Sequence, residues 1–130
     1  MKIREFDLDK DYKEVSKWWN DWNFPVIVPQ VLPPIGYIVE EGDSKICAGW
    51  VYRGTGTPMG WLEWIVSNKH IEKKKRGEGL DCLLSFVAKR ADDYGWILFS
   101  SLNNESLGKR LEKYGFNKTD TSMTNYIRGV

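Results

Sequence analysis

Residues 76–81 read Arg76-Gly77-Glu78-Gly79-Leu80-Asp81, and they stand directly before the strongest helical pattern in the chain. Apolar residues recur there at helical spacing over three turns, at Leu80, Leu83, Leu84, Val87, Ala88 and Ala91. Successive glycines let backbone N–H groups converge at a helix N-terminus, where a phosphate can bind. The stretch therefore predicts either a phosphate-binding loop or a flexible turn before a helix.

An antiparallel meander of strands is predicted upstream of this stretch. Two strands, Ile35–Glu40 and Lys45–Tyr52, are expected on either side of a short Gly-Asp turn. A second glycine-rich turn leads to a third strand, Trp61–Val66. A polar, basic loop at residues 67–78 then precedes the helix.

The N-terminal part of the chain predicts one strand, Ile3–Phe6, and one amphipathic helix. Four prolines between Asn23 and Pro34 forbid a helix interior, so we expect an ordered, extended loop there. The helix presents one apolar face, which carries Val15, Trp18, Trp19 and Trp22. The tryptophans beside the loop either wall an acceptor pocket or pack the core.

Three further elements are predicted downstream of the central helix. Residues 96–100 are typical of a buried strand, and a helix closed by Gly115 follows. A last strand pair is expected within residues 116–127. The apolar face of the second helix carries Leu107, Leu111 and Tyr114.

This order of elements predicts an α/β (α+β) fold with a mixed, mainly antiparallel sheet. The central helix joins two strands that must run parallel, and helices are expected on both faces of the sheet. A chain of 130 residues with 42% hydrophobic content suits one domain, residues 1–130.

Composition excludes several classes of function. The formal net charge is only +1, which argues against long-range attraction to nucleic acid or anionic lipid. No apolar run is long enough for a membrane span, and the N-terminus lacks the apolar region of a secretory signal, so we expect a cytoplasmic protein. Cys47 and Cys82 are expected to stay unpaired, and His70 is the single histidine, so neither a metal site nor a Ser/His/Asp triad is predicted.

The glycine motif resembles the pyrophosphate loop of the GNAT superfamily of acetyltransferases, and the resemblance covers about residues 35–128. Asp81 departs from that loop, because relatives carry Gly or Ala there. Residues 104–116 also resemble the family, with Asn104 and the Glu-Lys-x-Gly-Phe ending, although Leu111 stands where many relatives place a catalytic tyrosine. The strand Trp61–Val66 resembles the family's fourth strand. Short strings elsewhere look like the small GNAT-like proteins of tailed bacteriophages, which would place the protein in the host cytoplasm.

The resemblance implies acetyl transfer from acetyl-CoA to the amine of a small-molecule or protein acceptor, with no metal. Glu63 is implied as the general base and Tyr114 as a catalytic candidate. Cofactor binding is implied for the backbone of Ile65 and Val66 and for Lys74, Lys75, Arg76, Gly77, Glu78, Gly79, Leu80 and Asn104. A homodimer through late strands is typical of relatives.

Two alternatives remain open at the level of sequence. Leu111 and Asp81 favour a GNAT-fold protein that binds a partner or acyl-CoA without turnover. The basic run Lys73–Arg76, together with exposed tryptophans, would instead suit a small nucleic-acid-binding domain, against which the net charge argues.

Overall fold

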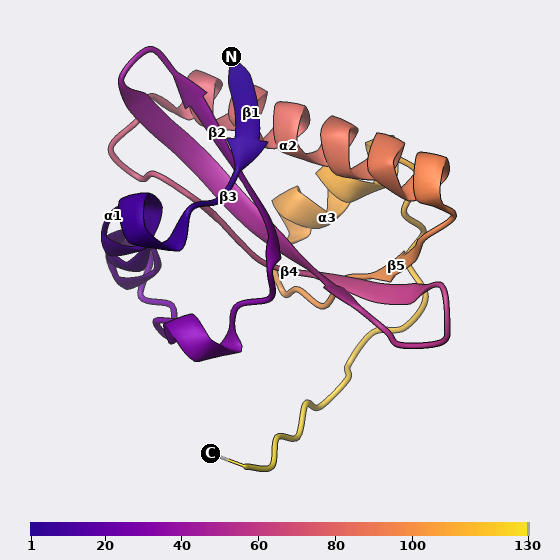
Figure 1. Cartoon of the computed structure of the whole chain (residues 1–130). Coiled ribbons are helices and arrows are strands. Elements are labelled where there is room, and N and C mark those ends of the chain that lie inside the picture. Colours follow the sequence, from indigo (N-terminus) through magenta and orange to yellow (C-terminus); the bar gives the residue numbers. More distant parts are fainter. Residues whose placement is uncertain (130) are drawn as a thin grey trace.

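The structure, a computed structural model that describes residues 1–129, is built around one five-stranded sheet (Figure 1). Neighbouring strands run antiparallel except for the last pair, which is parallel. The mixed, mainly antiparallel sheet is therefore confirmed. In spatial order the strands are β1 (Lys2–Glu5), β2 (Ile35–Glu41), β3 (Ser44–Arg53), β4 (Met59–Ser67) and β5 (Ile97–Phe99).

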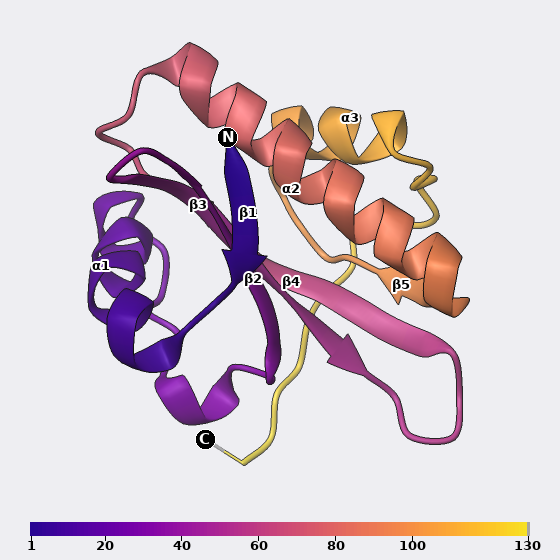
Figure 2. The ribbon, with the colours of Figure 1, turned by 45° about the horizontal axis from the view of Figure 1, so that its top comes forward.

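Helices cover both faces of this sheet, as predicted (Figure 2). Helix α1 (Leu8–Asp21) packs on one face, where Trp18 and Trp19 are buried against Trp50. Helices α2 (Lys73–Tyr94) and α3 (Glu105–Lys113) pack on the other. Trp18 and Trp19 thus belong to the core, which is the second of the two roles considered for them. No helix within residues 1–129 combines the length and apolar character that a membrane span requires.

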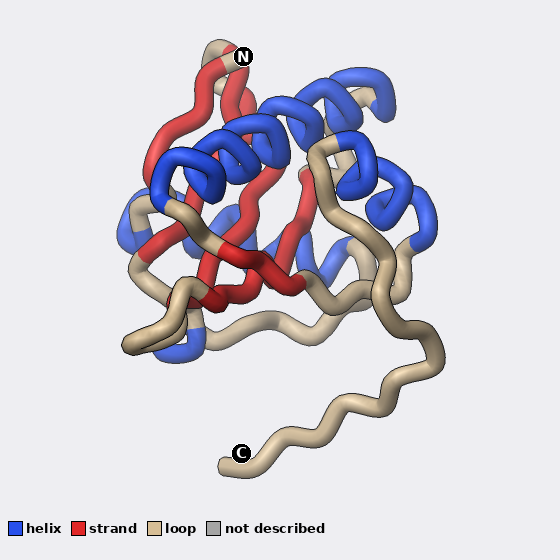
Figure 3. The backbone as a smooth tube through the Cα atoms, turned by 90° about the vertical axis from the view of Figure 1, so that its right-hand side faces the viewer, coloured by secondary structure: helices blue, strands red, loops and turns tan. Residues whose placement is uncertain are grey.

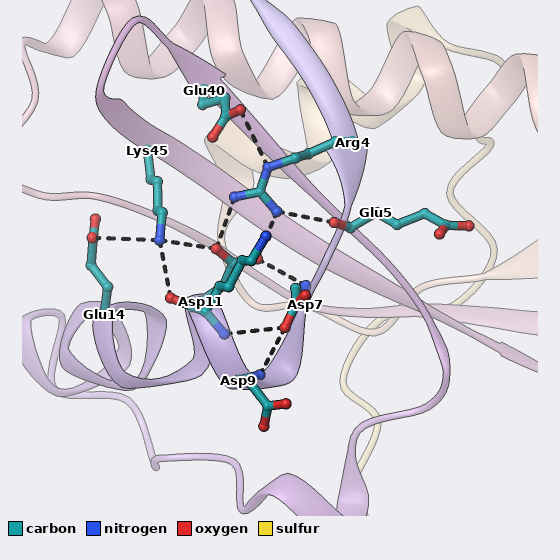
Figure 4. Close-up of polar contacts among 9 residues, drawn as sticks. Arg4, Glu5, Asp7, Asp9, Asp11, Glu14, Glu40 and Lys45 are labelled. Atoms are coloured by element: carbon teal, nitrogen blue, oxygen red, sulfur yellow. Dashed lines mark hydrogen bonds and ion pairs between the residues drawn. The ribbon is translucent and has the colours of Figure 1, made fainter.

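A buried carboxylate, Asp11, ties α1 to β1 and β3 (Figure 4). Arg4 donates to both of its oxygens at 2.8 and 2.9 Å, and Lys45 Nζ lies 2.9 Å away. The Asp7 N–H donates to it at 2.8 Å. Burial alone would raise the pKa of Asp11, but these hydrogen bonds and charges outweigh burial and hold that pKa well below its usual range.

The segment between α1 and β2 is an ordered connection, as predicted. It contains one short 3-10 helix, η1 (Pro29–Val31), and its prolines keep the rest extended. Tyr12 and Tyr52 hold it in place, because their hydroxyls donate to the carbonyl oxygens of Ile27 and Val31 at 2.7 and 2.6 Å. Both cysteines are free.

The predicted strand pair within residues 116–127 is wrong. Residues 114–129 form no strand, and they leave α3 as an extended segment (Figure 3). Phe116 still packs against the core, whereas Met123, Tyr126 and Ile127 lie in solvent, and Tyr126 is 92% exposed. No strand of the described sheet pairs with this segment.

The strand predicted at residues 96–100 exists as the shorter β5, and its predicted burial is wrong. Ile97 and Phe99 are exposed on one face, whereas Leu98 between them is half-buried on the other. Only the face toward α2 is covered, because α1 lies over the opposite end of the sheet (Figure 2).

Helix α2 begins earlier than predicted. We expected a loop as far as Glu78, but the helix starts at Lys73, with Glu72 as its N-cap residue. The first helical hydrogen bond runs from Arg76 N–H to the Glu72 carbonyl at 3.0 Å. Lysine, arginine and glutamate favour helix strongly enough to continue it through two glycines. The glycine motif is therefore part of the helix and not a loop before it.

Candidate active site

Strands β4 and β5 part after a short pairing. The two strands pair only from Met59 and Ile97 to Trp61 and Phe99. After Trp61, β4 continues to Ser67, and no further strand pairing occurs on its β5 side within the described residues. Beyond Leu62, the backbone of β4 is thus free of strand pairing along this edge, where another molecule can bind.

A β-bulge distorts β4 at the same place. Glu63 pairs with Trp50 and Val66 pairs with Ala48, so two residues of β4 face a single residue of β3. One of the two, Trp64, has a φ of 63°, which is the left-handed region that a bulky residue rarely adopts. Such strained positions cluster at functional sites.

Tryptophan side chains from α1 and the residue after it hold the bulge in place. The indole N–H of Trp19 donates to the Trp64 carbonyl at 3.3 Å, and that of Trp22 donates to the Ser67 carbonyl at 2.8 Å. The Trp64 indole in turn donates to the Tyr52 hydroxyl at 2.7 Å. The carbonyls of Trp64 and Ser67 therefore each accept a hydrogen bond, and the two indole rings support the strained backbone of the bulge.

Glu63 is half-buried just beyond the point where the β4–β5 pairing ends. Its Oε1 accepts a hydrogen bond from the Ser101 N–H at 3.1 Å, while the Ser100 hydroxyl donates to the Leu62 carbonyl at 2.7 Å. These contacts join β4 to the chain that follows β5. Burial raises the pKa of the Glu63 carboxyl, and the Ser101 N–H offsets part of that rise.

The basic residues predicted to bind phosphate lie on the first turns of α2, but two of them already have partners. Lys75 forms an ion pair with Glu41. Arg76 donates to the carbonyl oxygen of Ile71 at 2.6 Å and lies 5.6 Å from the centre of the Trp22 ring. Lys74 is exposed beside them.

The glycines of the motif serve packing in this structure. A Cβ on Gly79 would lie 2.5 Å from Ile46 Cγ2, so only a hydrogen fits where α2 crosses β3. A Cβ on Gly77 would lie 3.3 Å from the Arg110 guanidinium. Leu80 packs against the core and Glu78 is exposed.

Asp81, the departure from the family's loop, turns toward α3. Its Oδ2 lies 2.8 Å from Arg110, which also donates to the Gly77 carbonyl at 3.1 Å. The Tyr114 hydroxyl donates to Asp81 Oδ1 at 3.1 Å. Burial, followed by the contact with Asp81, raises the pKa of Tyr114. We call Asp81, Arg110 and Tyr114 the helix clamp, because they join α2 to α3.

The remaining predicted residues have structural partners. Asn104 is the N-cap of α3, where its Oδ1 accepts from the Leu107 N–H at 3.0 Å. Ile65 packs against the α2 side of the sheet, and Val66 is buried on the α1 side. The structure brings Glu63, Ile65 and Val66 together on β4, whereas Tyr114 is held at α2.

Three features of the site were missed at the level of sequence. Nothing in the string Glu63-Trp64-Ile65 indicates a tryptophan with left-handed backbone angles. The helix clamp joins Asp81 to Arg110 and Tyr114, which follow it by 29 and 33 positions in the sequence. The Ser100-Ser101 pair was noted as a hydrogen-bonding candidate, but its contact with Glu63 requires the tertiary structure. Within residues 1–129 no group of three or more acidic, histidine or cysteine side chains is placed to hold a metal ion.

No protein-family model matches the sequence, and no curated protein matches it. Solved structures do share its fold. A protein of Thermus thermophilus aligns with a TM-score of 0.72 at 18% identity, covering 100% of this chain and 99% of that one. A probable acetyltransferase of meticillin-resistant Staphylococcus aureus aligns at 0.71 and 15%, with 98% of each chain covered. Glucosamine-6-phosphate N-acetyltransferase of Arabidopsis thaliana aligns at 0.67 and 14%, again over 98% of each.

Proposed function

We propose that this protein is an N-acetyltransferase that moves the acetyl group of acetyl-CoA to an amine. The observation that carries the proposal is Glu63, a half-buried carboxylate with a raised pKa at the point where β4 parts from β5. The shared fold with acetyltransferases supports it. An amine near pKa 10 is mostly protonated at neutral pH, so a base is needed before it can attack a thioester.

In the proposed reaction Glu63 accepts a proton from the acceptor ammonium. The neutral amine nitrogen then bonds to the acetyl carbon and the carbon–sulfur bond breaks. As the amide forms, the nitrogen loses one proton and the thiolate takes one up, so this step neither gains nor loses a proton. A backbone N–H on the open edge of β4, at Ile65 or Val66, polarises the thioester carbonyl. The bulge supports this role, because it fixes the direction in which those backbone groups point.

The phosphates of acetyl-CoA are proposed to bind at the start of α2. The first-turn N–H groups have no side-chain cap and no acidic residue beside them in that turn, which suits an anion. Lys73 and Lys74 are exposed there, and Lys75 and Arg76 flank them. The anion site so proposed lies about one turn before Gly77 and Gly79, since those glycines are inside the helix.

Tyr114 is proposed as the proton donor to the thiolate. A phenol is protonated at neutral pH, and burial, which raises the pKa of Tyr114, favours that form further. To act, it must release the hydrogen bond to Asp81. A second candidate function follows from that bond: with Tyr114 engaged and Leu111 buried in the core, the protein would bind acyl-CoA without turnover.

Calorimetric titration with acetyl-CoA tests the proposal. The unaltered protein is compared with a Lys73→Glu, Lys74→Glu double variant. A Lys89→Glu, Lys109→Glu double variant, at exposed positions elsewhere, is the control. Saturable binding lost in the first variant and retained in the second is expected. An amine panel then separates the two functions, because thiol release with an acceptor excludes binding without turnover. Absence of acetyl-CoA binding to the unaltered protein would refute both.

A further inference from the structure

Three aromatic side chains form a row across the sheet beside Glu63. Trp61 pairs with Tyr52 on β3 and with Phe99 on β5, so the three residues are direct neighbours on adjacent strands. Glu63 lies two residues after Trp61 on the same strand, and therefore on the same face. We call Tyr52, Trp61 and Phe99 the aromatic row.

The aromatic row lies on the α1 face but outside the area that α1 covers. Trp61 is 40% exposed and Phe99 is 45% exposed, whereas Trp50, opposite Glu63, is fully buried beneath α1. The bulge tryptophan, Trp64, borders the row through its hydrogen bond to Tyr52. Neighbouring exposed aromatic side chains beside a half-buried carboxylate are typical of a binding site.

This surface carries almost no charge besides Glu63. Between Gly54 and Asn68 Glu63 is the single charged residue, and residues 22–39 contain none. The latter segment adjoins the row, since Tyr52 donates to the Val31 carbonyl. Arg53, the next cation along β3, lies over the Trp96 ring at 4.6 Å. A ligand with several charges would therefore find one counter-charge only.

We propose that the acceptor is a primary amine carried by an aromatic or apolar body, with one positive charge and no phosphate. This inference rests on the acetyltransferase function proposed above. The ammonium would lie at Glu63, and the body would cover the aromatic row. Tryptophan faces attract cations as well as apolar groups, so the row favours both parts of such an amine. Polyamines and aminoglycosides carry several positive charges, and sugar phosphates carry a phosphate, so none of them fits an apolar surface with one counter-charge.

Acetyl transfer to tryptamine, spermidine and glucosamine 6-phosphate tests the proposal. We expect kcat/KM for tryptamine to exceed the other two by about tenfold or more, the equivalent of one good aromatic contact. Trp61→Ala and Phe99→Ala should each raise the KM for tryptamine by a similar factor and leave the KM for acetyl-CoA unchanged. Tyr94→Ala is the matched control, because this exposed aromatic residue ends α2 and lies beside Trp96 instead.

Either of two results would overturn the proposal: equal or better turnover of spermidine, or the same tryptamine KM in Trp61→Ala as in Tyr94→Ala. A short peptide with an N-terminal Phe, run in parallel, separates a peptide acceptor from a small arylalkylamine. Circular dichroism melting confirms that each variant folds, and Phe99→Ala decides the question should Trp61→Ala not fold.

Binding of tryptamine to the protein saturated with CoA, measured by calorimetry, keeps this inference separate from the proposed function. Tryptamine binding that Trp61→Ala abolishes supports the aromatic row even without turnover. If tryptamine does not bind while acetyl transfer to another amine occurs, the proposed acceptor class is wrong and the proposed acetyltransferase function is retained. Absence of acetyl-CoA binding would reject the acetyltransferase function. Tryptamine binding to the protein alone would then decide whether the aromatic row binds such amines.

Discussion

Glu63 combines features that a general base requires, and each has a structural cause. Its position at the end of the β4–β5 pairing leaves it beside the unpaired edge of β4, and the hydrogen bond from the Ser101 N–H fixes its carboxylate. Partial burial raises its pKa toward the range in which a base can both hold and release a proton.

Glu63→Gln should lower kcat by about 10²- to 10⁴-fold, because the amide cannot accept the proton. Binding of acetyl-CoA should not change. In the unaltered protein kcat/KM for the amine should rise with pH as Glu63 loses its proton, at a pH above the ordinary value for glutamate. In the variant this inflection should vanish, and kcat/KM should instead follow only the fraction of neutral amine, which rises up to the amine's own pKa near 10. Rates measured from about pH 5 to 9 check this, and the same inflection in Glu63→Gln would assign the base elsewhere.

Asp11 dominates acid stability at the residue scale. Asp11→Asn should cost about 3 kcal/mol at pH 7, because the charges of Arg4 and Lys45 lose their shared partner. The folded-state pKa of Asp11 lies below the unfolded value near 4, so its stabilisation is complete above that value and is lost as pH falls below it. Urea unfolding at pH 7 and pH 3 should show a smaller pH effect in the variant. Glu14→Gln, at the exposed edge of the cluster, is the control.

At the scale of elements, the contact between α2 and β3 sets the position of the helix. Gly79→Ala would place a methyl group 2.5 Å from Ile46, and we expect destabilisation by about 1–3 kcal/mol despite the better helix propensity of alanine. Gly77→Ala is the matched control, since its new methyl meets only the flexible end of Arg110. Denaturant midpoints compare the two, and equal stability of both variants would contradict the close packing.

The helix clamp is the second determinant at this scale. Asp81→Asn removes the ion pair to Arg110, which is partly exposed, so the expected loss is only about 1 kcal/mol. The sharper readout is Tyr114, because Asp81 contributes to its raised pKa. NMR titration of labelled tyrosine should show the Tyr114 pKa fall toward 10 in the variant. An unchanged titration would mean that the two side chains do not meet in solution.

Elements with strong periodicity were predictable, and their ends and contacts were not. The apolar repeat from Leu80 to Ala91 identified α2, because a core face repeats every 3.6 residues whatever it packs against. Its start was wrong by about two turns, since glycines mark a loop in sequence whereas Gly79 is required by Ile46. Glu63 could be proposed from its strand, but the bulge and the row of Tyr52, Trp61 and Phe99 depend on strand register.

For the whole molecule, the sheet and its two covering layers account for the buried core, and residues 120–129 add nothing to it. Ending the chain after Thr119 should change the free energy of unfolding by less than about 0.5 kcal/mol, because Met123, Tyr126 and Ile127 are mostly in solvent. Thermal melts of both lengths check this. A loss above about 1 kcal/mol would show that these residues pair with the sheet edge in solution, as predicted from the sequence.

The indole bonds from Trp19 and Trp22 to β4 connect segments 45 residues apart in sequence. When α1 lifts from the sheet, the carbonyls of Trp64 and Ser67 lose their donors, and the left-handed backbone of the bulge loses its support. Local opening of the N-terminal helix and relaxation of the bulge should therefore be one event. In terms of amide hydrogen exchange, we expect α1 and the middle of β4 to behave as a single cooperative unit, which excludes the hairpin end of the same strand.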